Sequence, residues 1–342
     1  MPKTQITIPV FVPHLGCPHT CVFCNQRVTA GGADTPTPDQ VRGLILHYLG
    51  TVQPGVRRIE VAFFGGSFTA INPSVQRALL GTAREFLEAG TVHGIRVSTR
   101  PDCVDEPALE LLAEYGVDTV ELGAQSLDDG VLSLADRGHS AEDIRRAFRA
   151  VRGRGMRCVL QLMCGLPGDT HAKAVGSARE AALMNPDGAR IYPVVVLPGT
   201  GLETLFREGR YVPLTLEQAV ETAADMTGEF SCEGVPVIRT GLHPLRPEEA
   251  ARIVSGPYHP AFGFLVRARL RRREAESLLA AALDERRLEH PKRVVLVLPE
   301  RKAGEYLGGG RENLEWLRAR HPGLTLEFRV EPLAHALTLE LL

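Results

Sequence analysis

The sequence lacks a long apolar run and a secretory signal, and it contains few cysteines. No apolar run approaches the roughly 20 residues that a membrane-spanning helix needs, so we expect no membrane partner. The start, MPKTQITIPVFVP, has no basic region followed by a long apolar core and a small-residue cleavage site. Only seven cysteines occur among 342 residues. An odd count without an export signal predicts a reducing, cytoplasmic setting, where thiols bind metals more often than they cross-link.

Three of the seven cysteines are crowded into one short stretch, LGCPHTCVFCNQ, which contains Cys17, Cys21 and Cys24. Soft thiolates select zinc, copper(I) or iron–sulfur clusters. No fourth cysteine and no later C-x-x-C pair accompany them, although structural zinc sites usually close with four ligands. Three thiolates on a four-iron cluster would leave one iron open to a small molecule. Zinc held by the three thiolates and His14 or His19 is the alternative.

The other four cysteines are isolated in the sequence, and we interpret them as small buried hydrophobic residues: Cys103, Cys158, Cys164 and Cys232.

A strand–helix rhythm runs through the first two thirds of the chain. Apolar, β-rich runs are found at residues 6–13, 56–66, 94–101, 119–126, 157–167 and 188–198, with a seventh at 235–242. Helix patterns lie between them, with N-caps expected at Thr37 and Ser140. Such alternation implies parallel pairing, and near-continuous apolar strands imply that both faces of the sheet are covered. The sequence therefore predicts an α/β fold, a partial (β/α)6 TIM-like barrel whose site lies where strands end.

Beyond residue 243 the rhythm breaks. We expect a core barrel over 1–243, a linker or wrapping segment over 244–266 rich in Pro and Gly, and a small α/β extension over 267–342. The densest basic stretch, VRARLRRRE, opens this extension and is interpreted as a solvated helix face or a nucleic-acid contact.

The cysteine stretch, with Phe23 before its last cysteine, resembles the radical S-adenosylmethionine (radical SAM) superfamily. The resemblance implies a [4Fe–4S] cluster on the three cysteines and S-adenosylmethionine on the open iron. It also implies reductive formation of a 5′-deoxyadenosyl radical, with an electron donor such as ferredoxin or flavodoxin. Gly65 and Gly66 match the glycine pair that receives the methionine amino group, and Ser98 matches a cofactor contact.

The stretch LGAQSLDDGVLSLADRGH is similar to oxygen-independent coproporphyrinogen oxidases, in which a Gln and an Arg contact the nucleoside, so Gln125 and Arg137 inherit those roles. Gln161 stands where that family has a ribose-binding carboxylate. Those oxidases carry a further cysteine where this chain has Gln26, which argues against haem biosynthesis.

The chain most resembles the radical domain of the Elongator catalytic subunit, a tRNA wobble-uridine enzyme, over VAFFGGSFTAI, STRPD, VELGAQS, RGHS and DGARIYPVVVLPGTGLETLFREGRY. This likeness implies a tRNA substrate and places Tyr192 at the site.

The alternatives are a small-molecule substrate and a non-catalytic zinc or RNA-binding module. The extension is interpreted as a cap for the barrel, a KH-like RNA contact at GGGR, or an acetyl-CoA site. No catalytic residue is predicted.

Overall fold

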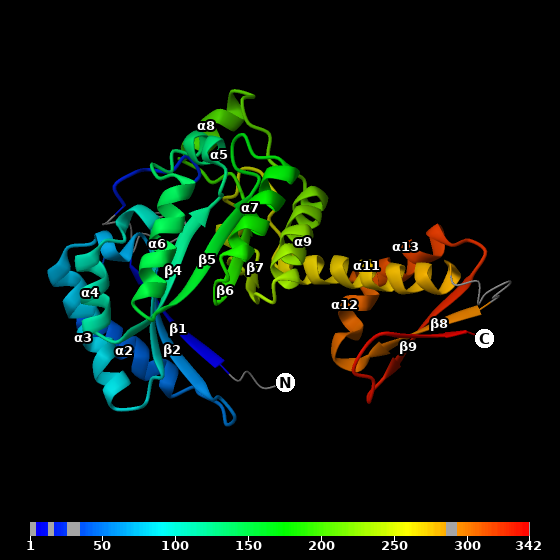
Figure 1. Cartoon of the computed structure of the whole chain (residues 1–342), viewed down its shortest axis with the longest axis horizontal. Helices are drawn as coiled ribbons and strands as arrows, with labels where there is room; N and C mark the ends of the chain where they lie inside the picture. The colour runs from blue at the N-terminus through cyan, green and yellow to red at the C-terminus, as the bar shows by residue number, and fades with distance from the viewer. Residues whose placement is uncertain (1–4, 13–16, 26–34, 285–292, 342) are drawn as a thin grey trace.

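The computed structural model describes residues 5–12, 17–25, 35–284 and 293–341. Its main sheet has seven strands that are all parallel, and neighbouring strands follow chain order. The strands are β1 (Gln5–Val12), β2 (Arg58–Gly65), β3 (Gly94–Thr99), β4 (Val117–Gln125), β5 (Arg157–Cys164), β6 (Gly188–Pro193) and β7 (Val237–Thr240). The sheet curls into a half-barrel (Figure 1), which confirms the predicted fold class and the seventh strand.

Helices cover the outer face of this sheet (Figure 1). They are α2 (Pro38–Leu49), α3 (Pro73–Glu88), α4 (Glu106–Glu114), α6 (Ala141–Gly153), α7 (His171–Leu183) and α9 (Leu216–Cys232). Thr37 and Ser140 cap α2 and α6 as predicted, and each cap forms a capping box, with Gln40 and Asp143 respectively. Two short helices, α5 (Asp129–Leu134) and α8 (Gly201–Arg207), follow the ends of β4 and β6.

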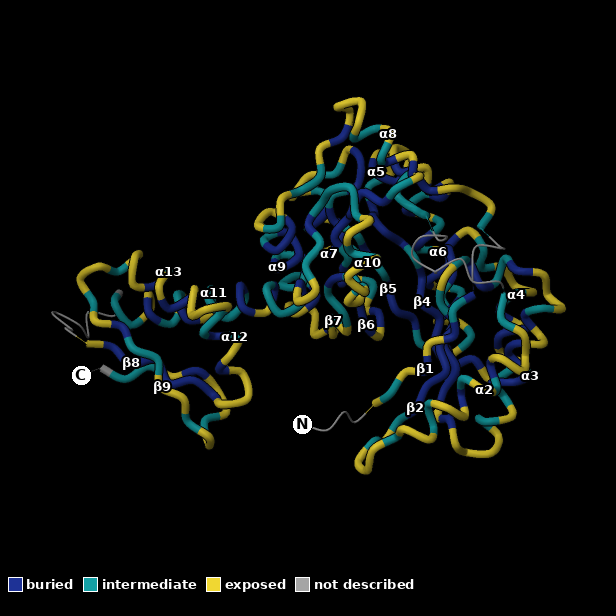
Figure 2. Tube along the Cα trace, turned by 180° about the vertical axis from the view of Figure 1, so that it is seen from behind, coloured by how far each residue is buried: buried dark blue, intermediate teal, exposed yellow. Residues whose placement is uncertain are grey.

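The core lies between the strands and the outer helices, and alternate strand residues such as Val61, Phe63, Val120 and Leu160 fill it. The intervening residues face the concave side of the half-barrel, which is turned toward the viewer in Figure 2. Contrary to the expected apolar pattern on both faces, this side carries charged residues inside the strands, including Glu60 and Arg96. The strands therefore have one apolar and one polar face.

The segment after β7 contains α10 (Pro247–Ala250) and then returns to the barrel. Val196 forms an antiparallel bridge with Ser255, in which the Val196 N–H donates to the Ser255 carbonyl at 2.8 Å. The interpretation of residues 244–266 as a linker or wrapping segment stays a prediction. Helix α11 (Phe262–Asp284) follows and extends away from the half-barrel (Figure 1).

The last unit, at the far end of α11 (Figure 1), has its own small apolar core. A three-stranded sheet with the order β10-β8-β9 combines a parallel and an antiparallel pair. Its elements are β8 (Arg293–Pro299), α12 (Ala303–Leu307), α13 (Glu312–Arg320), β9 (Thr325–Glu331) and β10 (Thr338–Leu341).

The basic stretch on α11 is neither a bare solvated face nor a free cationic surface. Arg269 pairs with Glu217 of α9 at 2.6 Å, and Arg273 pairs with Asp225 of α9 at 2.6 Å. Arg272 lies over the Trp316 ring, 4.4 Å from its centroid. These side chains fasten α11 to its neighbours, so this stretch offers little positive charge to a nucleic acid.

Candidate active site

The cysteine loop follows β1, at the edge of the sheet where parallel strands end. Cys21 is buried, while Cys17 and Cys24 are half-buried. The Cys24 N–H donates to the Cys21 carbonyl at 3.0 Å, which turns the chain back between these two thiols. Within the described ranges, no three His, Cys, Asp or Glu side chains converge closely enough to hold a metal ion. The loop supplies three soft donors, which a metal would have to gather if it bound here.

Two buried guanidinium groups contact the Cys21 sulfur. Arg137 Nη1 donates to Cys21 Sγ at 3.0 Å, and Arg100 Nη1 donates to it at 3.6 Å. Asp102 holds Arg100 through two hydrogen bonds of 2.9 and 2.8 Å. Arg137 is anchored by the Gly123 carbonyl at 2.6 Å. Positive charge here suits a sulfur that binds metal as a thiolate. The nucleoside contact that the resemblance implies for Arg137 stays a prediction.

Cys17 lies in the same environment. Burial raises the pKa of the Cys17 thiol, and the Ser67 N–H and the Arg100 charge oppose this only in part. Ligation by metal would relieve this cost, because a metal-bound thiol is deprotonated outright.

Gly65 ends β2 beside this loop, and Gly66 follows the strand. Gly65 has a φ of +121°, and a β-carbon there would lie 2.1 Å from the Val12 carbonyl oxygen. The Gly66 N–H donates to that same oxygen at 3.0 Å. The chain therefore needs glycine at residue 65 for its own packing against β1. The methionine contact implied for this pair is a separate matter that stays a prediction.

Four further predicted residues lie on the inner face of the sheet. Gln125 has a positive φ of 68° at a register shift in β4, and its Oε1 accepts a hydrogen bond from Gln161 Nε2 at 3.2 Å. Ser98 Oγ is buried and has no hydrogen-bond partner among the described residues. Tyr192 on β6 accepts a hydrogen bond from Arg190 at 3.1 Å. A buried hydroxyl without a partner and a strained glutamine are both features that a bound ligand explains.

A charged layer beneath these residues was missed by the sequence analysis. Arg96 Nη2 donates to Glu60 at 3.0 Å, and Arg190 Nε lies 3.0 Å from Glu121. Burial raises the pKa of Glu121 even though Arg190 and Arg96 oppose it. Arg190 also lies over the Phe64 ring of β2, 5.2 Å from its centroid, so it reaches across the half-barrel. The inner face thus carries paired charges on β2, β3, β4 and β6 below the strand ends.

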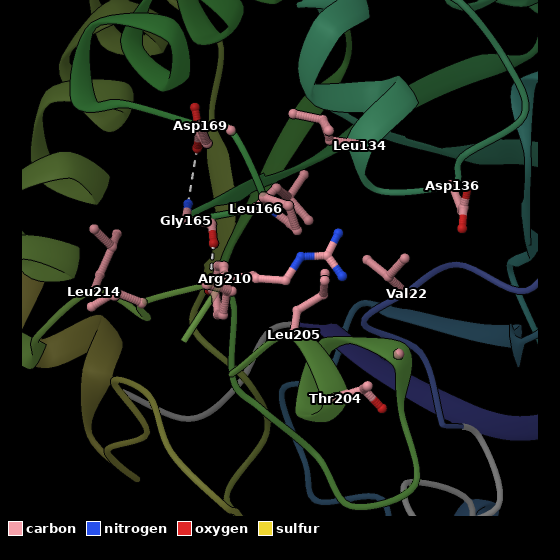
Figure 3. Close-up of a pocket in the computed structure, with 15 residues that line it drawn as sticks. Val22, Leu134, Asp136, Gly165, Leu166, Asp169, Thr204, Leu205, Arg210 and Leu214 are labelled. Atoms are coloured by element: carbon pink, nitrogen blue, oxygen red, sulfur yellow. Dashed lines mark hydrogen bonds between the residues drawn. The ribbon is translucent and has the colours of Figure 1, made fainter. Parts of the chain in front are cut away.

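Phe23 packs into a small apolar cluster with Leu202, Val196 and neighbouring residues. This cluster borders a cavity of about 650 Å³ between α8, the loop after β5 and Val22. Figure 3 shows Arg210 extending across this cavity between Leu205 and Leu166. The cavity lies beside the cysteine loop, and Val22 of that loop forms part of its wall.

The remaining predictions have mixed outcomes. Cys158 and Cys164 are fully buried, as predicted, but Cys232 is exposed and Cys103 is only half-buried. His19 is exposed, and its ring lies where a β-carbon on Gly138 would be. His14 and Gln26 lie outside the described residues. Arg100 was not predicted as a site residue. The sequence does contain a signal for it, because in STRPD it is a charged residue directly after a buried strand.

The chain is similar to known protein families, curated proteins and solved structures. The sequence profile of the Radical SAM superfamily matches residues 11–181, and that of the Radical_SAM C-terminal domain matches residues 186–272. A tRNA uridine(34) acetyltransferase of Dehalococcoides mccartyi is 28% identical over 60% of this chain and 52% of that protein. Human Elongator complex protein 3 is 26% identical over 49% of this chain and 35% of that protein.

Among solved structures, the archaeal Methanocaldococcus infernus Elp3, with its N-terminus deleted, superposes with a TM-score of 0.63. It is 23% identical, with 80% of this chain and 64% of that chain covered, so it supports the fold alone. The chain spans about half the length of the tRNA uridine(34) acetyltransferases that it matches. No helix in the described ranges is long and apolar enough to cross a membrane.

Proposed function

Because the chain belongs to the radical SAM superfamily of enzymes, we propose that Cys17, Cys21 and Cys24 hold a [4Fe–4S] cluster and that the enzyme cleaves S-adenosylmethionine reductively. The observation that carries the proposal is the three-cysteine loop at the strand ends, with the Cys21 sulfur under two buried guanidinium groups. When bound, the cluster and cofactor supply a 5′-deoxyadenosyl radical that takes hydrogen from the substrate.

The residues of the inner face fit a polar cofactor next to this loop. Ser98 offers a buried hydroxyl without a partner, and the Gln125–Gln161 pair offers amide donors and acceptors. Tyr192 lies on the same face, where Arg190 orients its hydroxyl. Gly65 is exposed at the end of β2, so the backbone of the Gly65–Gly66 turn is accessible to a cofactor. These residues would bind and orient the cofactor.

We assign tRNA as the substrate class, with one-electron reduction by a protein such as ferredoxin or flavodoxin in the cytoplasm. Support comes from relatives named tRNA uridine(34) acetyltransferase and Elongator complex protein 3, which match the barrel region. We assign the barrel to residues 1–243, the wrapping segment to 244–266 and a capping unit to 267–342. A small-molecule substrate is the second candidate, because carboxylates and an aromatic ring engage the arginines of the densest basic stretch.

Anaerobic purification tests the proposal. The protein should be brown, carry about four iron and four sulfide per chain, and release 5′-deoxyadenosine from S-adenosylmethionine once reduced. Added tRNA should raise that release if it is the substrate. Gly66→Val should lower the release while the iron content stays normal, because a side chain there narrows the approach to the strand end. A colourless protein with stoichiometric zinc would show that the cluster assignment is wrong.

A further inference from the structure

The turn Pro198–Glu203, with the sequence PGTGLE, lies against the cysteine loop although about 175 residues separate them in the chain. The Leu202 N–H donates to the Val22 carbonyl at 2.7 Å. From the loop, Asn25 Nδ2 donates to the Pro198 carbonyl at 2.5 Å. Val22 lies between Cys21 and Cys24, and Asn25 follows Cys24. The contacts therefore fall on the part of the loop that carries two of its three thiols.

The turn itself is tied together by its own side chains. Thr200 Oγ1 donates to the Leu197 carbonyl at 2.7 Å and accepts a hydrogen bond from the Glu203 N–H at 3.1 Å. The Glu203 carboxylate accepts a hydrogen bond from the Gly199 N–H at 2.7 Å. Thr200 is buried and caps the N-terminus of α8. A turn fixed in this way presents its carbonyl and N–H groups in one arrangement.

The two glycines of the turn permit the close approach. Gly199 has a φ of +72°, and a β-carbon there would lie 3.2 Å from Asn25 Nδ2. A β-carbon on Gly201 would lie 3.6 Å from the backbone and side chain of Val22. Leu202, which is fully buried, packs in the apolar cluster that Val22 and Phe23 flank. Each residue of PGTGLE thus either contacts the cysteine loop or stabilises the turn itself.

A second support lies on the opposite side of Val22. The Val22 N–H donates to the carbonyl of Ala135, just after α5, at 3.2 Å. The peptide groups on both sides of Val22 are therefore hydrogen-bonded, one to the α5 end and one to the turn.

We propose that Pro198–Glu203 is a clamp that fixes the backbone of the cysteine loop from Val22 to Asn25 against the barrel, so that its residues are positioning residues for a loop whose thiols a metal would then gather. The proposal rests on the proposed function only in that the loop binds a metal. Loss of the clamp leaves the fold intact and lets the loop open, which speeds both loss of metal and exposure of the thiols of Cys21 and Cys24.

Gly199→Ala tests the clamp against a matched control, Gly209→Ala. Gly209 has a φ of +70°, so both substitutions carry the same backbone cost, but no atom lies within 4 Å of a β-carbon on Gly209. The readouts are iron loss from the anaerobically loaded protein to a chelator and, in the metal-free protein, alkylation of Cys21 and Cys24 by iodoacetamide, followed by mass spectrometry. Thermal unfolding of the metal-free variants reports the fold.

We expect both rates to rise about fivefold in Gly199→Ala relative to Gly209→Ala, the effect of weakening roughly one hydrogen bond, with equal unfolding temperatures. Asn25→Ala, which removes the hydrogen bond to Pro198, should raise both rates similarly. If Gly199→Ala does not fold, Asn25→Ala tests the clamp in its place. Equal rates in the variants and the control would overturn the clamp. Wild-type protein that takes up no iron would overturn the proposed function instead, and the alkylation rates would still test the clamp.

Discussion

Gly65→Ala should destabilise the protein for a reason that has nothing to do with a bound cofactor. The new β-carbon would lie 2.1 Å from the Val12 carbonyl oxygen and 3.1 Å from the Phe11 ring. A φ of +121° adds strain of about 1–2 kcal/mol for any residue with a side chain. Relief requires β1 to move, which breaks the 3.0 Å hydrogen bond from Gly66 to Val12, worth about 1 kcal/mol.

Together these contributions predict a loss of about 2–3 kcal/mol in the free energy of unfolding. Gly55→Ala is the matched control, because Gly55 also has a positive φ, of +98°, but no atom lies within 4 Å of its β-carbon. It should cost only the strain, about 1–2 kcal/mol. Urea unfolding of the metal-free proteins, followed by circular dichroism, measures both. Equal losses in the two variants would refute the assignment of Gly65 to packing against β1.

Three further predictions concern charge and ligation. Arg100→Gln should make the cluster about tenfold harder to reduce, a shift of about 59 mV to lower potential, in an anaerobic redox titration followed by electron paramagnetic resonance; an unchanged potential would contradict the role of Arg100. Cys17→Ala should abolish iron binding while Cys232→Ala, at an exposed position, retains it; full iron content in Cys17→Ala would rule out the ligand set. Burial raises the pKa of Asp169 to about 6, so its protonation stabilises the folded state below pH roughly 4 and this contribution is lost as the pH rises through about 6. Asp169→Asn should therefore flatten the pH dependence of the unfolding temperature in that window, and a slope equal to that of the wild type would exclude this carboxyl as its source.

The sheet was predictable because its signals are local. Each strand is a short apolar run, and each crossover helix begins at a recognisable cap such as Thr37 or Ser140. The cysteine loop was predictable for the same reason, since its spacing is contained in eight residues. The start of α11 was not: the predicted extension begins at residue 267, whereas the helix begins at Phe262. Residues 256–261 contain no Ser, Thr, Asp or Asn to mark an N-cap in the sequence.

Most pairs among the inner charges could not be predicted because the partners lie on different strands. The pairing of Glu60 with Arg58 at 2.8 Å is local, since both belong to β2. Arg96, by contrast, is a single charge between two apolar residues, and nothing local shows that it meets Glu60 across β2 and β3 at 3.0 Å. The same holds for Arg100 and Arg137, which reach one sulfur from separate loops. A lone charge in a buried strand is costly unless a partner compensates it. Such a residue in a parallel sheet is therefore itself a signal: it predicts that the concave face is polar and that a site lies above it.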